Sequence, residues 1–364
     1  MSKIRARFEE IKNHPYLPAG AFVAGFVFDI VTLDRADSLF QILQQAAYLA
    51  FLTWLLYAKI LYEHGLITIP QKLQRIWKYH EFTVQFLLGS LLSVYTLFYI
   101  KSASILSSLI FVFLIAALLV INEFVRLKRN QIVLSLVLFF LCLASYFIYL
   151  VPTLLGFVGV FPFALALVIT LGCVAFVYRI IERKFRANPE MKKMVERKIV
   201  YSGGGVIALF LVSYVLQIIP PVPVSLSYIG IFRDVHKENG QYVLSYTRPW
   251  WRFWENGDQT FYARPGDSIV AFVRVFAPTG FRDEFRIRWL LRTPRGWEKQ
   301  DSIPITVAGG RDQGFRGYTV KANYQPGHYR IQVETTDARE VGRLYMDVHP
   351  DAETGPRELK ELRQ

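Results

Sequence analysis

Residues 160–198 read VFPFALALVITLGCVAFVYRIIERKFRANPEMKKMVERK, an apolar run followed at once by a strongly basic segment. An apolar run of roughly 20 residues is long enough to cross a bilayer as a helix. Short cationic segments beside such helices remain in the cytoplasm. This stretch therefore predicts a membrane protein and places residues 182–198 on the cytoplasmic side.

The same pattern recurs through the first 224 residues. Of the 21 lysines and arginines there, 19 fall in segments that one threading of the chain puts on a single side, and only Arg35 and Lys101 fall on the other. The threading needs an odd number of spans, which predicts a cytoplasmic N-terminus and a C-terminal part outside the cytoplasm. The seven predicted spans are 16–33, 40–61, 82–100, 104–121, 131–150, 160–180 and 199–219.

Two points in this threading have alternatives. A single helix through the fifth and sixth runs would return the C-terminal part to the cytoplasm, but Pro152, Gly156, Gly159 and Pro162 interrupt the stretch. A helix of that length would also be about twice what a bilayer needs, so two spans are favoured. The basic N-terminus has no convincing cleavage pattern, so the first run is expected to remain as an anchor.

After the Pro220–Pro223 segment the hydrophobic period changes from helical to alternating. Residues 284–292, 329–334 and 343–348 alternate apolar and polar side chains, and Ile269–Phe276 is apolar on both faces, as in a central strand. The predicted fold is an α-helical polytopic membrane bundle followed by an all-β sandwich of about eight strands, immunoglobulin-like or jelly-roll-like. The predicted parts are 1–224 (membrane), 225–350 (extracytoplasmic sandwich) and 351–364 (charged flexible tail).

Composition excludes some classes of function. The net charge of +13 arises mostly in short loops between apolar runs rather than on a soluble face, so we expect no nucleic-acid partner. Both cysteines, Cys142 and Cys173, lie within apolar runs and are expected to be small apolar fillers. They could form a pair only if the fifth and sixth spans place them face to face, and the C-terminal part has no cysteine for a disulfide. No histidine pair has metal-ligand spacing, and no catalytic motif occurs. We therefore expect no metal and no cofactor, and enzyme activity is not favoured.

A distinctive motif lies in the C-terminal part. It comprises Gly309-Gly310-Arg311, then Pro326-Gly327-His328-Tyr329-Arg330-Ile331-Gln332-Val333, then Gly342-Arg343. Over residues 285–348 the chain resembles the bacterial family known as domain of unknown function 2914. The segments Phe28-Asp29, Thr32-Leu33 and Arg35-Ala36-Asp37 look like a multi-span membrane module often joined to that domain in Gram-negative bacteria. Neither resemblance implies a reaction; both imply only the architecture.

The first group of candidate site residues lies near the outer end of the first span. An ionisable residue at membrane depth is costly, so it indicates a functional site by default. The group could bind a cation, relay a proton or hold a lipid head-group. The alternative is structural, with Asp29 bridging helices and Arg35 neutralising a neighbouring carboxylate. The members are Asp29, Thr32, Asp34, Arg35, Asp37 and Gln41, with Gln44 and Gln45 close behind.

The second group is aromatic. Trp250, Trp251, Phe253 and Trp254 lie within residues 248–254, together with Arg248 and Arg252. Three interpretations remain open: packing in the sandwich core, contact with the outer leaflet, or a platform on which sugar rings stack while arginines meet phosphate or carboxylate.

The third group is a row of arginines. Alternation places Arg286, Arg288 and Arg292 on one face of a strand, where they could contact an anionic polysaccharide or lipid. Nearby acidic residues offset the charge, so a solvated face is favoured over a binding surface.

These observations predict a bacterial inner-membrane protein whose periplasmic sandwich binds an envelope component, such as a polysaccharide or lipid head-group, or a partner protein. A transporter or lipid-handling protein that uses the polar group around Asp29 is the alternative. An intramembrane enzyme is a third, less favoured class.

Overall fold

The computed structural model describes residues 38–103, 131–186, 188–311, 313–353 and 355–364. Contacts divide the chain into two compact units. The helical unit holds the described membrane-type helices and extends to Ile219. The β unit holds residues 220–364, the segment 152–160, which connects two helices, and the last residues of the helix that ends at Ser102.

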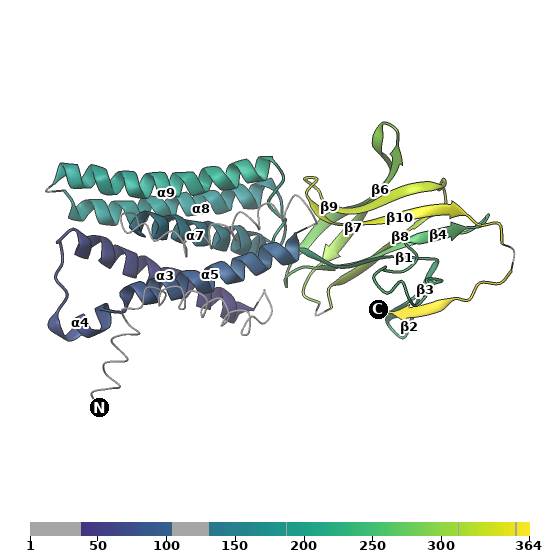
Figure 1. The fold of residues 1–364 in the computed structure, drawn as a ribbon, viewed down its shortest axis with the longest axis horizontal. Helices are drawn as coiled ribbons and strands as arrows, with labels where there is room; N and C mark the ends of the chain where they lie inside the picture. The colour runs from purple at the N-terminus through teal and green to yellow at the C-terminus, as the bar shows by residue number, and fades with distance from the viewer. Residues whose placement is uncertain (1–37, 104–130, 187, 312, 354) are drawn as a thin grey trace, which may run out of the picture. The chain divides into compact units, whose positions relative to one another are not determined.

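Six helices lie in the part of the chain that the structure describes (Figure 1). Five of these are long and apolar enough to cross a membrane, and they coincide with the predicted spans at 40–61, 82–100, 131–150, 160–180 and 199–219. The predicted spans at 16–33 and 104–121 lie outside the described residues. The bounds are α3 Leu39–Glu63, α4 Gln71–Trp77, α5 His80–Ser102, α7 Gln131–Leu155, α8 Val160–Lys184 and α9 Pro189–Val215.

Helix α9 begins well before its apolar run. The side chain of Asn188 caps it by accepting a hydrogen bond from the Met191 N–H at 3.2 Å, and Pro189 occupies the first turn. Both residues favour a helix start at this point, and Glu190 adds a negative charge where the helix dipole favours one. The expected loop 182–198 therefore consists mostly of the end of α8 and the start of α9.

Close contacts hold the helical unit together. The hydroxyl of Tyr99 on α5 donates a hydrogen bond to Ser145 Oγ on α7 at 3.2 Å. A Cβ added to Gly203 of α9 would lie 2.9 Å from Cγ1 of Val174 on α8, so a larger residue would force the valine side chain or the helices to shift. Small residues at such crossings are how membrane helices pack closely.

Eleven strands lie in the described part of the β unit, in three sheets (Figure 1). The sheet orders are β1-β5-β8, β4-β10-β9-β6-β7 and β11-β3-β2. Strand β4 pairs in parallel with β10, and the other pairs are antiparallel. The bounds are β1 Ser225–Phe232, β2 Asp234–Glu238, β3 Gln241–Tyr246, β4 Thr260–Ala263, β5 Ile269–Phe276, β6 Arg282–Thr293, β7 Gly296–Ala308, β8 Phe315–Lys321, β9 Gly327–Thr335, β10 Glu340–Pro350 and β11 Lys360–Arg363.

Strand β5 is buried on both faces, as its sequence predicts. Alternate residues such as Ala271 and Val273 belong to a hydrophobic cluster shared with the five-stranded sheet, where Trp289 is fully buried. The intervening Val270 and Phe272 pack against a second cluster formed with β3. The β unit therefore has one main core between the five-stranded sheet and the β1-β5-β8 sheet, and a smaller core between β5 and the β11-β3-β2 sheet.

The C-terminal segment is paired rather than loose. Strand β11 pairs antiparallel with β3, and the guanidinium of Arg357 bonds Asp267 at 2.7 Å. Because β3 would otherwise be an unpaired edge, its free backbone groups offer partners to any nearby extended chain. The charged composition of 351–364 predicts a flexible tail, but Asp351, Arg357 and Arg363 form ion pairs.

One end of the β unit, which we call the entry end, collects the segments that continue into helices. Val158, between α7 and α8, is buried in the main core, and its N–H donates to Asp283 at 3.0 Å. The Arg282 N–H donates to the Gly156 carbonyl at 2.8 Å. Strand β1, which follows α9 in the chain, starts at this end, where Ser225 pairs with the last residue of β5.

The opposite end, which we call the far end, contains the last residue of β1, the last residues of β10 and strand β4. Register places Phe232 beside the start of β5 and Pro350 beside the end of β4. The β3–β4 loop, with the four neighbouring aromatic residues, joins this end because Gly257 bridges to Ile231 near the end of β1.

A candidate ligand cavity at the far end of the β unit

A cavity of about 860 Å³ lies at the far end. The end of β1, the β3–β4 loop, β4, the end of β10 and the C-terminal segment build its wall. It is lined by Arg233, Thr247, Pro249, Trp250, Trp251, Tyr262, Arg264, Pro350, Asp351, Glu353, Pro356, Arg357, Glu358 and Lys360. Its volume lies within the range of small-molecule sites, and most of its lining side chains are polar or charged.

Asp258 does not line the cavity, but it holds two residues that do, Arg233 and Thr247. Its carboxylate accepts hydrogen bonds from the Thr247 N–H at 2.8 Å and the Thr247 hydroxyl at 2.9 Å, and Arg233 Nε lies 3.0 Å away. Asp258 is 2% exposed, so its charge is compensated by these groups rather than by water. The arrangement fixes the start of the β3–β4 loop against the end of β1.

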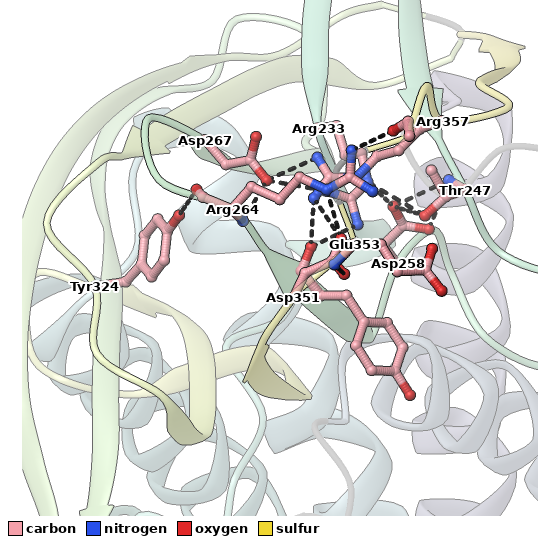
Figure 2. A network of polar contacts seen from close by, with 11 residues as sticks. Arg233, Thr247, Asp258, Arg264, Asp267, Tyr324, Asp351, Glu353 and Arg357 are labelled. Atoms are coloured by element: carbon pink, nitrogen blue, oxygen red, sulfur yellow. Dashed lines mark hydrogen bonds and ion pairs between the residues drawn. The ribbon is translucent and has the colours of Figure 1, made fainter.

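Two further arginines line the cavity at its rim, and Figure 2 shows their polar contacts. Arg264 Nε bonds Asp351 at 2.7 Å, and Arg357 bonds Asp267 at 2.7 Å and Asp351 at 3.1 Å. Arg233 also reaches Asp267 at 3.4 Å. The arginines and aspartates of the network balance in charge, so the cavity holds ordered donors and acceptors without a strong net potential.

Hydrogen bonds keep the rim carboxylates ionised. The Glu353 N–H and Arg264 lower the pKa of Asp351 to about 2. Burial raises the pKa of Asp267, but the Arg264 N–H and Arg357 outweigh it, so this pKa is also lowered. Hydrogen bonds to the charged form of a carboxylate always act in this direction.

The tryptophan segment is exposed, which excludes core packing as its role. Trp250 is 83% exposed, Phe253 78%, Trp254 63% and Trp251 48%. Trp250 and Trp251 line the cavity. The guanidinium of Arg252 lies 4.8 Å from the centroid of the Trp251 ring, which steadies that indole. Of the three interpretations, the outer leaflet and the stacking platform remain.

Arg286 and Arg288 lie away from the cavity. Both point from β6 to the outer face of the five-stranded sheet, where Arg288 Nε contacts Glu334 at 3.0 Å. Burial raises the pKa of Glu334 while Arg288 lowers it, and burial prevails. Glu284 pairs with Arg286 and Glu334 pairs with Arg288, so acidic residues neutralise this row. The pairing favours a solvated sheet face over an anion-binding surface.

Of the first candidate group, Asp29, Thr32, Asp34, Arg35 and Asp37 lie outside the described residues. Gln41 is in α3, where it is 6% exposed, and Gln45 one turn later is 4% exposed. The Oε1 atoms of both have no hydrogen-bond partner among the residues that the structure describes. A buried amide oxygen without a hydrogen-bond partner is costly, so the two glutamines form a polar site on the buried face of α3.

The helical unit has a cavity of its own, of about 390 Å³. Helices α3, α4 and α5 surround it, with Lys184 of α8 at its wall. Trp54, Leu61 and Ile76 are among the mostly apolar side chains that line it. A cavity of this kind suits an acyl chain or another apolar ligand.

The described residues contain no group of three or more histidines, cysteines, aspartates and glutamates that could hold a metal. Cys142 and Cys173 are both free thiols.

Sequence reasoning missed the arginine–aspartate network. Its members come from separate segments of the chain without regular spacing, so no sequence pattern predicts that they lie together. They are Arg233, Asp258, Arg264, Asp267 and Arg357. One local signal existed: Pro265-Gly266-Asp267 is a turn in which the aspartate side chain bonds the Arg264 N–H at 2.9 Å.

Residues 283–348 match the family described as Protein of unknown function (DUF2914), which confirms the resemblance expected from the Gly309 motif. The matched segment covers nearly all of β6–β10. Every residue lining the cavity lies outside it.

No protein with a curated description matches the chain. Among solved structures, the alkylpurine DNA glycosylase AlkC of Pseudomonas fluorescens, bound to DNA containing an abasic site analogue, aligns over 79% of this chain and 84% of that chain, with 11% identity and a TM-score of 0.18. A TM-score that low carries no argument about fold or function. The segment 283–348 is thus similar to a family of unknown function, and the similarity brings no activity with it.

Proposed function

We propose that this protein is a multi-pass bacterial inner-membrane protein whose β unit lies outside the cytoplasm and binds an envelope component in the far-end cavity. The five apolar helices and the one-sided distribution of cations support the membrane part. With further spans at 16–33 and 104–121, the count is seven, which puts the N-terminus in the cytoplasm and the β unit in the periplasm.

The β unit is proposed to be a variant of the β-sandwich. Two sheets share one core, as in a sandwich, and the third sheet, β11-β3-β2, covers the outer side of β5. This added layer brings the C-terminal segment and the β3–β4 loop together, and it thereby forms the cavity.

Two of the exposed tryptophans line the cavity, which supports an envelope ligand over contact with the outer leaflet. The segments that continue into α7, α8 and α9 meet the β unit at its entry end. The cavity and the exposed tryptophans lie at the far end. We therefore propose that the tryptophans serve ligand binding in the cavity, and the interpretation in which they rest on the bilayer is the less favoured one.

The observation that carries the proposal is the combination of two exposed indoles with a charge-balanced arginine–aspartate network in one cavity. Indole faces supply large contact area at low entropic cost. The network supplies fixed donors and acceptors for hydroxyl, amide or carboxylate groups. A hydroxyl-rich ligand with apolar ring faces uses both features.

The test is binding of soluble envelope fractions to the full-length protein in nanodiscs. We expect Trp251→Ala to weaken binding at least tenfold, because one stacked face is lost. Phe253→Ala is the matched control: it removes an exposed aromatic residue that does not line the cavity, and binding should be unchanged. Equal losses in the two variants, or no binding by the wild type, would refute the proposal.

Lipid handling is the second candidate, favoured by the apolar cavity among α3, α4 and α5. Ala58 lines this cavity and is buried, so Ala58→Phe should fill it. Native mass spectrometry should then show fewer retained phospholipids than in the wild type. Ala50→Phe, at an exposed position of the same helix, is the control. Unchanged lipid retention in Ala58→Phe would exclude this site.

A further inference from the structure

A row of aromatic side chains continues from the cavity across the outer face of the five-stranded sheet. Tyr262, which lines the cavity, is the cross-strand partner of His349, and their ring centroids are 5.7 Å apart. Farther along, the rings of His328 and Tyr345 lie 5.7 Å apart with planes at 2°. Trp297 of β7 lies 5.5 Å from His328.

The register of the strands places all these rings on one face. Tyr345 and His349 alternate along β10 with Met346 and Val348, which are buried in the main core. Since neighbouring residues on a strand point to opposite faces, the rings point outward. Tyr262 is 49% exposed and Tyr345 is 39% exposed, so their ring surfaces are accessible.

Polar contacts hold the rings in place. His328 Nδ1 lies 2.6 Å from Asp347 Oδ1, and Arg343 donates a hydrogen bond to the Tyr345 hydroxyl at 3.1 Å. The Arg330 guanidinium lies 4.9 Å from the centroid of the Trp297 ring. Ordered side chains lose little further entropy when a ligand binds.

We infer that the cavity is one end of an extended glycan-binding surface that reaches Trp297. This inference rests on the proposed function and names its ligand class. The row crosses β7, β6, β9, β10 and β4, which at about 4.8 Å between neighbouring strands spans roughly 19 Å. A ligand that reaches from Trp297 to Trp251 is therefore a chain of several sugar units rather than one.

The distribution of charge and apolar surface favours a glycan over a lipid or a protein. The rings are separated by paired polar groups, whereas lipid insertion and protein hot spots need a contiguous apolar area. A pyranose ring has an apolar C–H face that can stack on an aromatic ring, whose face is negative. Its hydroxyl groups can meet Asp347, Arg330 and Arg343 between the rings.

The test measures how affinity depends on ligand length. The full-length protein in nanodiscs is titrated with cell-wall glycan strands and with outer-membrane polysaccharide fragments, each separated by chain length. In the wild type, strands of six or more sugar units should bind at least tenfold more tightly than disaccharides. Trp297→Ala should abolish this advantage of length and leave the affinity for short fragments unchanged.

The controls separate the two proposals. Trp251→Ala should weaken the binding of short and long fragments alike. Tyr318→Ala removes an exposed tyrosine of β8, in the β1-β5-β8 sheet, and should leave the affinity for short and long fragments unchanged. Equal affinity for short and long fragments in the wild type, or an unchanged length advantage in Trp297→Ala, overturns the extended surface but leaves the cavity. Absence of binding by every fraction overturns both.

Discussion

At the scale of single residues, the far end depends on a few buried or paired charges. Asp258 has a carboxylate whose charge is compensated by Thr247 and Arg233, and it holds the start of the β3–β4 loop, which carries the tryptophans. Such groups seldom add much net stability compared with an apolar substitute, but loss of one partner leaves the other charge buried. The tryptophans themselves could be found from sequence. Their exposure could not, because an aromatic run suits a core, an interface or a platform equally well.

Neutralising Asp258 should destabilise the β unit. Asp258→Asn keeps the shape of the side chain but leaves the Arg233 guanidinium with a weaker partner at 3.0 Å, and we expect a loss of about 3 kcal/mol. Thermal unfolding of the full chain, followed by tryptophan fluorescence, measures it. Asp234→Asn, at an exposed strand position, is the control and should have no measurable effect. Equal effects of the two changes would contradict the role of Asp258.

The lowered pKa values predict how the rim responds to acid. Asp351 has a folded-state pKa of about 2, below the roughly 3.9 of an unfolded chain. Its contribution to stability is therefore complete above about pH 4 and is lost as the pH falls towards 2. Melting temperatures between pH 2 and pH 7 should show this loss, and Asp351→Asn should make it smaller. An identical acid dependence in the variant would contradict it.

At the scale of elements, apolar run length and alternation locate most helices and strands. Five predicted spans have counterparts because about 20 apolar residues have few other stable arrangements. The start of α9 and the pairing of β11 were not predicted, since both lie in charged segments where hydrophobic patterns are silent. Capping residues set where α9 begins, and the otherwise unpaired edge of β3 provides the pairing partner for β11.

The Gly309 motif should act through backbone packing. A Cβ at Gly309 would lie 1.9 Å from the Pro278 carbonyl oxygen, so the β7–β8 connection must move away from the β5–β6 turn. Gly309→Ala should therefore cost about 2 kcal/mol of stability. Gly355→Ala, where a Cβ would meet nothing within 4 Å, is the matched control. Unfolding midpoints that do not differ between the two variants would show that the motif has another role.

At the scale of the whole molecule, the two ends of the β unit differ in which chain segments reach them. The 152–160 segment, which connects α7 to α8 in the chain, contributes Val158 to the main core at the entry end. The number and charge of the apolar runs predict where the chain crosses a membrane. The cavity could not be predicted in this way, because it is assembled from segments that only the fold brings together.

The central claim is that the far-end cavity faces the envelope and binds there. Its most direct test uses single cysteines, with Cys142 and Cys173 first replaced by serine, labelled with an impermeant maleimide in cells whose outer membrane is permeabilised. The account predicts labelling at Glu358→Cys, on the cavity wall, and at Gln300→Cys on β7, but none at Glu190→Cys before lysis. Added envelope glycan should slow labelling at Glu358→Cys alone. Labelling of Glu190→Cys in unlysed cells, or no protection at Glu358→Cys, would contradict it.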